Sequence, residues 1–224
     1  MNINVIVTGT TGMVGEGVLL ECLAHPDVKQ VLSVVRKPSG LKHPKLKELA
    51  ISDFMKPEGF RNQLAGYDAC FYCAGITSIG ASEADYTRIT YDTTIKFARV
   101  LNEVNKNMVF CYISGAMTDS TEKGRLMWAR VKGRTENELM RIFFKRAYNF
   151  RPGFIQPAEG QQKLKPFYKV IGVFYPVIRF LFPRSFITMQ ELGQAMINSV
   201  LMGYEKQVLE IQDIKKLQRM SQPG

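Results

Sequence analysis

The apolar residues of the chain form short β-branched or aromatic runs that alternate with longer stretches of helical periodicity. Such runs are typical of strands that are buried on both faces of a sheet. They predict strands at residues 3–7, 29–35, 46–51, 67–73, 108–113 and 147–150. The stretches between them predict helices at residues 14–23, 82–105 and 125–144, with a brief helical turn at 59–64. This alternation predicts the α/β class, with a doubly wound parallel sheet.

The strict alternation ends at Arg151-Pro152-Gly153, and the remaining residues form a different pattern. Residues 170–182 are apolar nearly throughout, and residues 189–201 predict a final amphipathic helix before a polar tail. A length of 224 residues fits one large domain or one domain with a small appendage. We therefore expect a single Rossmann domain with a dinucleotide-binding core at 1–155 and a helical substrate or lid region at 156–224.

A glycine-rich turn separates the first predicted strand from the first predicted helix. Its sequence is Thr8-Gly9-Thr10-Thr11-Gly12-Met13-Val14-Gly15, which gives the spacing G-x-x-G-x-x-G. Gly9 allows the tight turn, Gly12 lets a pyrophosphate approach the backbone, and Gly15 lets the helix pack closely on the strand. The helix start offers free N–H groups and a positive dipole end to phosphates. The turn predicts a dinucleotide site, and a glycine-rich turn that binds nothing is the alternative.

The second predicted strand ends at Arg36-Lys37-Pro38, where a Rossmann unit that prefers NAD carries an acidic residue for the ribose hydroxyls. A cation at this place suits a 2′-phosphate instead, so Arg36 and Lys37 favour NADP(H) over NAD(H). An ordinary basic loop is the alternative interpretation.

The chain is basic, with 30 lysines and arginines against 20 acidic residues and a formal net charge of +10. A basic surface attracts nucleic acids, anionic lipids and phosphorylated ligands. The basic residues are dispersed in runs of at most two, so the charge indicates a solvated surface and help in binding an anionic cofactor. No nucleic-acid partner is expected, because no basic stripe is present.

The cysteines and histidines do not indicate a metal site. Cys22, Cys70, Cys73 and Cys111 all fall inside apolar stretches, as expected of reduced core thiols. Cys70 and Cys73 have a metal or redox spacing, but no second pair follows and the two positions point to opposite faces of a strand. The only two histidines precede prolines. With no signal peptide expected, these features predict a cytoplasmic protein without a metal.

Several ordered motifs together resemble a known superfamily. They are the glycine turn, Ala74-Gly75 after the fourth strand, Ser114 after the fifth, Lys132 on the next helix and Arg151-Pro152-Gly153 after the sixth. The pattern resembles the extended or atypical short-chain dehydrogenase/reductases, the NAD-dependent epimerase/dehydratase-like group. The residues around these motifs are most similar to those of the Tat-interactive-protein-like oxidoreductase branch. The resemblance covers residues 1 to about 200.

The resemblance implies a catalytic set of Ser, Tyr and Lys, in which Tyr is the acid/base and Ser binds the substrate oxygen. The Lys lowers the pKa of the phenol and holds the nicotinamide ribose, so Ser114 and Lys132 are expected to contact the cofactor as well. Ser114 and Lys132 match this set, but Trp128 stands at the usual Tyr position. An indole N–H donates a hydrogen bond but does not shuttle protons near neutral pH. A strand cap at Ser114 and a solvated helix charge at Lys132 are the alternatives.

Other residues are assigned to the cofactor through the same resemblance. Asp53 and Phe54 would lie at the adenine, Arg36 at the 2′-phosphate, and Ala74, Gly75, Pro152 and Gly153 along the dinucleotide. Five tyrosines are candidate replacements for the missing acid/base, although the sequence places none of their hydroxyls at the nicotinamide; they are Tyr72, Tyr86, Tyr91, Tyr112 and Tyr168.

The apolar segment 170–183 has three interpretations. It is too short and too interrupted, at Pro176 and Arg179, for a transmembrane span. It would form the core or a lid over an apolar substrate pocket, bury itself in a homodimer, or make peripheral contact with a membrane.

The sequence therefore predicts an NADPH-dependent oxidoreductase acting on an unknown small or apolar carbonyl or alcohol. A catalytically impaired NADPH-binding sensor or regulatory module is the alternative, and Trp128 is its main support.

Overall fold

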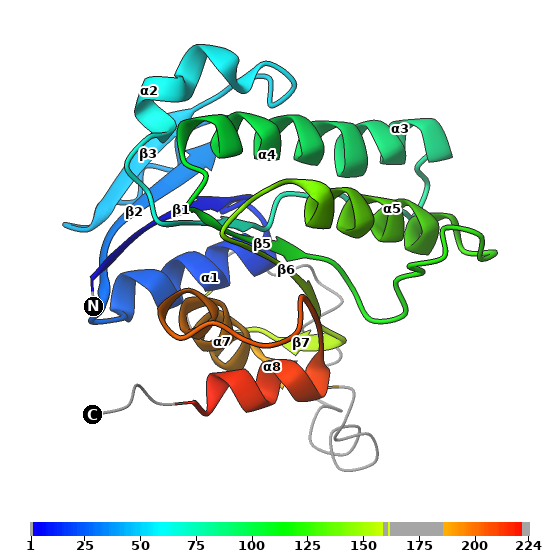
Figure 1. Ribbon diagram of the computed structural model, residues 1–224. Coiled ribbons are helices and arrows are strands. Elements are labelled where there is room, and N and C mark those ends of the chain that lie inside the picture. Colours follow the sequence, from blue (N-terminus) through cyan, green and yellow to red (C-terminus); the bar gives the residue numbers. More distant parts are fainter. Residues whose placement is uncertain (1, 159–160, 162–185, 221–224) are drawn as a thin grey trace.

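A seven-stranded parallel sheet forms the centre of the protein in the computed structural model, which describes residues 2–158, 161 and 186–220 (Figure 1). The strand order is β3-β2-β1-β4-β5-β6-β9, and each neighbouring pair is parallel. The predicted doubly wound α/β fold is therefore confirmed. The strands are β1 (Ile3–Thr8), β2 (Val28–Val35), β3 (Leu46–Ala50), β4 (Ala69–Tyr72), β5 (Val109–Ile113), β6 (Arg146–Arg151) and β9 (Val208–Glu210).

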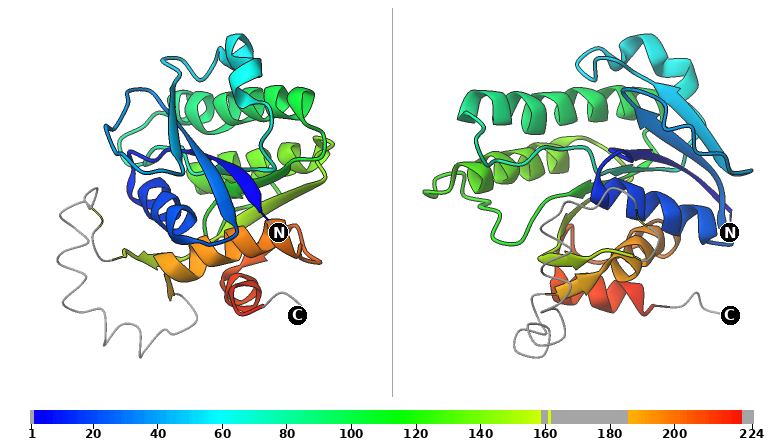
Figure 2. Two further views of the ribbon diagram at one scale, coloured as in Figure 1. Left: turned by 90° about the vertical axis from the view of Figure 1, so that its left-hand side faces the viewer. Right: turned by 180° about the vertical axis from the view of Figure 1, so that it is seen from behind.

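Helices cover both faces of the sheet, as Figures 1 and 2 show. On one face lie α1 (Met13–Ala24), α7 (Met189–Leu201) and α8 (Ile211–Gln218). On the other lie α3 (Glu83–Thr87), a π-helical turn η2 (Arg88–Asp92), α4 (Thr93–Val104) and α5 (Met127–Arg141). The short pieces η1 (Pro57–Phe60) and α2 (Arg61–Leu64) follow β3.

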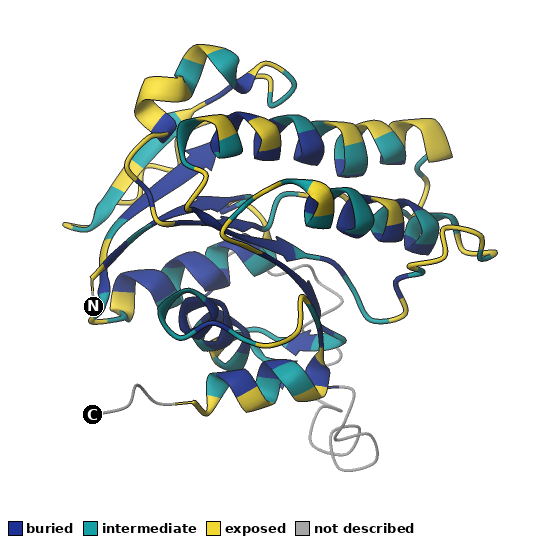
Figure 3. Ribbon diagram, in the orientation of Figure 1, coloured by how far each residue is buried: buried dark blue, intermediate teal, exposed yellow. Residues whose placement is uncertain are grey.

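The alternation of side chains along β1 divides the core between the two faces. Val5 and Val7 are fully buried in the cluster that α1 and α7 complete. Ile6, between them, is buried on the opposite face with Phe97 of α4 and Leu139 of α5. Figure 3 accordingly shows the inner strands buried along their length. The continuous apolar run at the N-terminus thus follows from burial on both faces.

The described part of the C-terminal region adds elements that the sequence did not predict. Three-residue strands β7 (Phe154–Gln156) and β8 (Phe186–Thr188) pair in parallel as a separate small sheet. β9 extends the main sheet by pairing with β6, and α8 follows it. Strands this short carry no readable periodicity, so only their pairing partners define them. The predicted helix at 189–201 is present as α7, while the apolar segment 170–183 lies outside the described residues.

The remaining differences concern the bounds of elements. The predicted strand 67–73 is shorter, and the predicted helix 125–144 begins at Met127 and ends at Arg141. The predicted helix 82–105 is divided into α3, η2 and α4, and Ser82 caps its start by accepting a hydrogen bond from the Asp85 N–H at 3.1 Å. The carboxyl ends of all seven main strands lie on one edge of the sheet, where the chain order reverses between β1 and β4. Open α/β sheets bind ligands at such a point.

Candidate functional site

The glycine turn between β1 and α1 is tightly packed at two positions and open at the third. Gly9 has φ +70°, and a Cβ there would meet the Ala74 backbone at 2.7 Å. A Cβ on Gly15 would collide with the carbonyl oxygen of Gly9. At Gly12 the nearest atom to an added Cβ is that same oxygen at 3.4 Å, which is ordinary contact distance. Gly9 and Gly15 therefore serve the fold, whereas the bare backbone at Gly12 faces open space.

The turn is fastened to the neighbouring strand by a threonine. The Thr8 hydroxyl accepts hydrogen bonds from the backbone N–H groups of Cys73 and Ala74, each at 3.2 Å. Gly12 is the N-cap of α1, and no side chain caps this helix start. The first N–H groups of α1 therefore point out at the edge where β4 ends, which is the arrangement that receives a phosphate.

A hollow runs along this edge on both sides of the glycine turn. One part, of about 420 Å³, extends toward the end of β2, and the other, of about 680 Å³, extends toward β5 and β6. The two parts share a wall around the turn and the end of β4, made of Thr11, Gly12, Cys73, Ala74, Gly75 and Ile76. A Cβ on Gly75 would have nothing within 4 Å. The combined space suits an elongated ligand that crosses the turn.

The part beyond β2 brings together residues predicted to hold the adenosine end. Arg36, Asp53 and Phe54 all line it, and the Asp53 carboxylate also accepts a hydrogen bond from the Met55 N–H at 2.9 Å. Arg88 of η2 lines the same space, which the sequence did not indicate because it lies 52 residues beyond Arg36. Two guanidinium groups thus stand at this end of the hollow. Tyr72, a candidate replacement for the acid/base, lines this part and not the larger one. Other lining residues that the sequence did not indicate are Val34, Val35, Ser52, Met55, Ile89 and Thr93.

Two of the predicted cofactor residues lie away from the wall. The Thr10 side chain is buried, and its hydroxyl is 2.7 Å from the Ser33 hydroxyl of β2. Lys37 is exposed and is not among the described residues that line either part of the hollow. Thr10 therefore braces the turn against β2, and Arg36 is the residue of the basic pair that reaches the hollow.

The larger part of the hollow gathers the predicted catalytic and nicotinamide-side residues. Met13, Val14, Gly15, Ser114, Lys132, Pro152 and Gly153 all line it. The Lys132 ammonium donates to the carbonyl oxygens of Ile113 at 3.1 Å and Ser114 at 3.2 Å. Burial lowers the pKa of Lys132 to about 8, although Glu136 one turn further along α5 favours its charged form. Lys132 is therefore held at the end of β5 as a poorly solvated cation.

The Ser114 hydroxyl is engaged by a residue that the sequence did not single out. Ser114 Oγ lies 3.0 Å from Thr118 Oγ1, and Thr118 in turn donates its own proton to the Gly115 carbonyl at 2.7 Å. A hydroxyl has one proton to give, so Ser114 is the donor in this pair. In this arrangement the Ser114 proton points to Thr118, and its lone pairs remain for other donors.

Trp128 does not stand in for the missing tyrosine. It is not among the described lining residues, and its ring lies 3.7 Å from the place where a Cβ of Gly115 would be. Among the candidate tyrosines, Tyr86 and Tyr112 line the larger part of the hollow, and both are almost completely buried. Burial raises the pKa of each phenol. Further lining residues that were not expected are Thr77, Thr90, Ile113, Gly115, Ala116 and Ile155.

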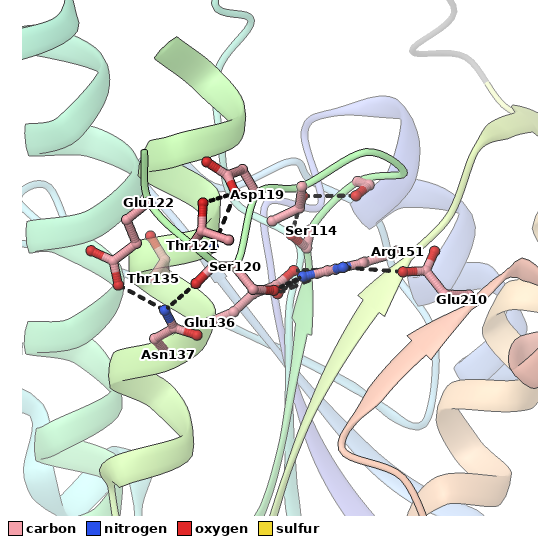
Figure 4. Close-up of polar contacts among 12 residues, drawn as sticks. Ser114, Asp119, Ser120, Thr121, Glu122, Thr135, Glu136, Asn137, Arg151 and Glu210 are labelled. Atoms are coloured by element: carbon pink, nitrogen blue, oxygen red, sulfur yellow. Dashed lines mark hydrogen bonds and ion pairs between the residues drawn. The ribbon is translucent and has the colours of Figure 1, made fainter. Parts of the chain in front are cut away.

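A buried ion pair fixes the helix that carries Lys132 to the end of β6 (Figure 4). The Arg151 guanidinium contacts the fully buried Glu136 carboxylate, with Nη2–Oε2 at 2.5 Å. The same guanidinium donates to Glu210 of β9 at 3.1 Å and to the Ser120 hydroxyl at 2.6 Å. Arg151 thus forms the ion pair with Glu136, the acidic residue one turn from Lys132 on α5. Lys132 itself has no carboxylate partner in an ion pair among the described residues.

The cysteines stay apart. Cys70 is buried in the cluster that α4 and α5 complete, and Cys73 packs against the opposite cluster. All four cysteines are free thiols, and the part of the chain that the structure describes holds no group of three or more potential metal ligands. The C-x-x-C spacing therefore reflects strand packing.

Comparison with known proteins identifies the superfamily to which this site belongs. The family model described as "NAD dependent epimerase/dehydratase family" matches residues 5–123. The chain belongs to the NAD dependent epimerase/dehydratase family. This confirms the resemblance to the extended short-chain dehydrogenase/reductases that the ordered motifs indicated.

Several solved structures share the fold of this chain. The Bordetella bronchiseptica enzyme WbmF, solved in complex with NAD+, superposes with a TM-score of 0.66 at 17% identity, covering 96% of this chain and 77% of WbmF. The oxidoreductase ylbE from Lactococcus lactis gives a TM-score of 0.67 at 16% identity over 96% of this chain and 95% of its own. At this identity the likeness concerns the fold alone, which is that of a NAD(P)-binding domain.

A curated relative by sequence corrects the expected location. The protein fmp52-1, mitochondrial, of Aspergillus terreus is 29% identical over 167 residues, covering 71% of this chain and 70% of that protein. Related fungal proteins bear the same designation as mitochondrial. The prediction of a cytoplasmic protein is therefore wrong, and the relatives point to the mitochondrion. The prediction rested on buried free thiols, which indicate reducing conditions and do not distinguish one compartment from another. Within the described residues, every helix is too short or too polar to cross a membrane.

Proposed function

We propose that this protein is an NADPH-dependent oxidoreductase that acts on an uncharged, apolar carbonyl compound or the corresponding alcohol. One observation carries the proposal. Two hollows share a wall at the glycine turn, with Arg36 and Arg88 lining one and Ser114 and Lys132 lining the other. This order matches the order of charge along NADPH, from the 2′-phosphate through the pyrophosphate to the nicotinamide.

The described residues fit such a cofactor. Gly12 and Gly75 leave the backbone bare in the middle of the hollow, where side chains would obstruct a pyrophosphate. The uncapped start of α1 would receive the pyrophosphate, and Asp53 and Phe54 would border the adenine. When bound, the reduced cofactor supplies a hydride, and its reactive ring would lie by Ser114 and Lys132.

The preference for NADPH rests on the two arginines. Guanidinium groups bind phosphates through paired, charge-assisted hydrogen bonds. Asp53 is the acidic residue of the adenosine-side wall, and its carboxylate accepts from the Met55 backbone. Asp53 also follows β3 and not β2, where an acidic ribose ligand of NAD-preferring domains stands. These features support a ligand that carries a phosphate on the ribose.

The substrate class follows from the walls beside Ser114. Among the described residues that line the larger part of the hollow, Lys132 is the single charged side chain. Ile76, Ile113 and Ile155 contribute apolar surface, with the two buried tyrosines between them. Several structural neighbours are named for sugar-acid substrates, such as the glucuronic acid dehydrogenase of Chromohalobacter salexigens. The described residues of this wall include no arginine to pair with a carboxylate of that kind, which favours a neutral substrate.

A competing function is an NADPH-binding sensor that does not turn over. Trp128 at the usual tyrosine position is the observation that supports it, because its ring packs by Gly115 and Trp128 is not among the described residues that line the hollow. Both functions require the same cofactor site, and they differ in what happens to the bound cofactor.

Two measurements on the full chain separate these functions. Quenching or enhancement of NADPH fluorescence reports binding, and loss of absorbance at the reduced nicotinamide reports turnover. The panel should contain neutral apolar aldehydes and ketones alongside uronates and nucleotide sugars. We expect binding, and turnover of neutral members only. Binding without turnover, unchanged in Trp128→Tyr, supports the sensor. Failure of NADPH to bind overturns both.

A further inference from the structure

The missing tyrosine leaves the question of which group delivers the proton. Reduction of a carbonyl adds a proton to its oxygen, and the donor must lie against that oxygen. Among the described residues lining the larger part of the hollow, groups with an exchangeable side-chain proton are Thr11, Cys73, Thr77, Tyr86, Thr90, Tyr112, Ser114 and Lys132. The threonines and Ser114 have hydroxyls that do not ionise in this pH range, so each would only relay a proton.

The two tyrosines are poorly placed to take over the role. Lys132 Nζ lies over the face of the Tyr112 ring, 5.3 Å from its centroid, so the cation contacts the π system instead of the phenolic oxygen. Burial raises the pKa of Tyr112 and of Tyr86, and no charged partner of either is found that would lower it strongly. Cys73 likewise has its pKa raised by burial. These groups hold their protons firmly.

Lys132 has an N–H bond to spare. An ammonium carries three donors, and two of them reach the carbonyl oxygens of Ile113 and Ser114. Both acceptors are backbone carbonyls at the end of β5, and they hold Nζ at the part of the wall to which Ser114 belongs. Ser114 gives its proton to Thr118 and so has none left to donate to a substrate. The third N–H of the Lys132 ammonium is therefore the charged hydrogen-bond donor that remains in this part of the wall. No carboxylate competes for it within the described residues, since Arg151 engages Glu136.

We propose that Lys132 itself is the proton donor to the substrate oxygen, in place of the tyrosine that Trp128 replaces. The proposal rests on the proposed function and assigns its acid. The bound NADPH would supply hydride to the carbonyl carbon and be oxidised to NADP+, and the electron pair of the C=O π bond would move to oxygen. That oxygen takes the proton from Nζ, and the resulting neutral amine regains a proton from water. Carbonyl, hydride and proton thus give the alcohol.

The surroundings of Lys132 suit this exchange. Burial lowers the pKa of its ammonium to about 8. A general acid works best when its pKa lies near the working pH, because it is then protonated and still releases its proton readily. Glu136 on its own helix and the Tyr112 ring of β5 act directly on the ammonium. Tyr86 of α3 and Thr90 of η2 line the same part of the hollow, and Arg151 of β6 contacts Glu136. Glu136 is the anion among these, and it keeps the ammonium charged at neutral pH.

The first test needs neither substrate nor turnover. The full chain, without cofactor, is acetylated briefly at a series of pH values, and modification of the Lys132 peptide is quantified by mass spectrometry against exposed Lys123. We expect the Lys132 reaction to rise with a midpoint near pH 8, well below the ordinary lysine value of 10.5. A Lys132 midpoint at the ordinary lysine value overturns the proposal.

The second test separates the charge of Lys132 from its proton. Lys132→Arg keeps a cation and its donors but does not release a proton below about pH 12. We expect NADPH binding to persist and the reduction rate to fall about 10²–10⁴-fold. In the wild type the rate should decline above about pH 8, as the amine becomes neutral. Lys123→Arg is the matched control and should leave both unchanged.

The outcomes distinguish this proposal from the function on which it rests. Turnover in Lys132→Arg within tenfold of the wild type overturns the proton role and leaves the oxidoreductase standing. If that occurs, loss of turnover in Tyr86→Phe or Tyr112→Phe would identify the true acid. Wild-type chain that binds NADPH and never turns over overturns the oxidoreductase, and the proton role with it.

Discussion

The Arg151 guanidinium and the Glu136 carboxylate form the most deeply buried ion pair among the described residues, with side-chain exposures of 11% and 0%. The pair joins the end of β6 to the middle of α5, one helical turn beyond Lys132 (Figure 4). It therefore sets the distance between the helix that carries Lys132 and the strand that leads into Pro152 and Gly153. An ion pair this deep is costly to break, because either partner alone would be an unpaired buried charge.

Removing one partner of this pair should be far more damaging than removing both. We expect Arg151→Met to lower the free energy of unfolding by about 3–5 kcal/mol, and Arg151→Met with Glu136→Leu to recover much of that loss. Urea titration of the three proteins measures this. The control is Arg141→Met, whose ion pair with Glu138 is at the surface with Arg141 74% exposed and should matter by less than about 1 kcal/mol. Equal losses for Arg151→Met and Arg141→Met would contradict this account.

The three glycines of the turn should respond differently to the same change. Gly12→Ala places a methyl group at ordinary contact distance, 3.4 Å from the nearest atom, so the fold should persist while nucleotide affinity falls steeply. Gly15→Ala would force its methyl into the Gly9 carbonyl and should cost about 1–3 kcal/mol of stability or more. Thermal melting and NADPH titration of both variants separate the two effects. A Gly12→Ala protein with undiminished affinity would remove the pyrophosphate from this turn.

The contrast between these glycines also shows how far the sequence could be read. The strand–turn–helix context predicted the turn, and burial on both faces predicted β1, because each depends on residues next to one another. Arg88 and the partner of Glu136 were not predicted, because their roles arise from packing between segments that are 15 to 59 residues apart, and no local spacing encodes such contacts. Thr118 was also not predicted, although it lies only four residues from Ser114, because a hydroxyl in an irregular loop has no diagnostic spacing. Thr10 is an error of the opposite kind. Its position in the glycine motif predicted a cofactor contact, but its hydroxyl is buried against Ser33.

The cofactor preference can be tested at a pair of adjacent residues. Arg36 lines the hollow and Lys37 does not, although both are exposed cations after β2. We expect Arg36→Gln to weaken NADPH binding about tenfold while changing NADH binding little, because one charge-assisted contact to a phosphate is lost. Lys37→Gln should leave both affinities within about twofold. If Arg36→Gln weakened the two cofactors equally, the 2′-phosphate would have to lie elsewhere.

Arg88 gives an independent check of the same end of the hollow. It stands on η2, and its ion pair with Asp85 is loose, at 3.6 Å. Arg88→Gln should also weaken NADPH more than NADH, and its effect should diminish in high salt because the side chain is 65% exposed. Isothermal titration at low and high salt measures this. An Arg88→Gln variant that binds NADPH as the wild type does would leave Arg36 as the sole phosphate ligand.

Lys132 should be a residue whose removal stabilises the protein. Its pKa falls from an ordinary value of 10.5 to about 8 on folding, so the folded state disfavours the charged form. Below pH 8 both states bind the proton and this cost is complete. Between pH 8 and 10.5 the unfolded chain binds more protons, and the stability of the wild type rises with pH. Lys132→Met should therefore be more stable at pH 7 by about 1–3 kcal/mol, after allowance for the lost hydrogen bonds and partial exposure.

The advantage of Lys132→Met should shrink as the pH rises toward 10.5, because the wild-type amine then becomes neutral in both states. Urea titrations at pH 7 and pH 10 measure the change, with Lys123→Met as the exposed control that should show no such trend. A variant less stable than the wild type at pH 7 would mean that the two carbonyl hydrogen bonds outweigh the cost of burial. The expected result would mean that Lys132 lowers the stability of the fold and serves function instead. Such a trade of stability for activity is common where a site requires a poorly solvated charge.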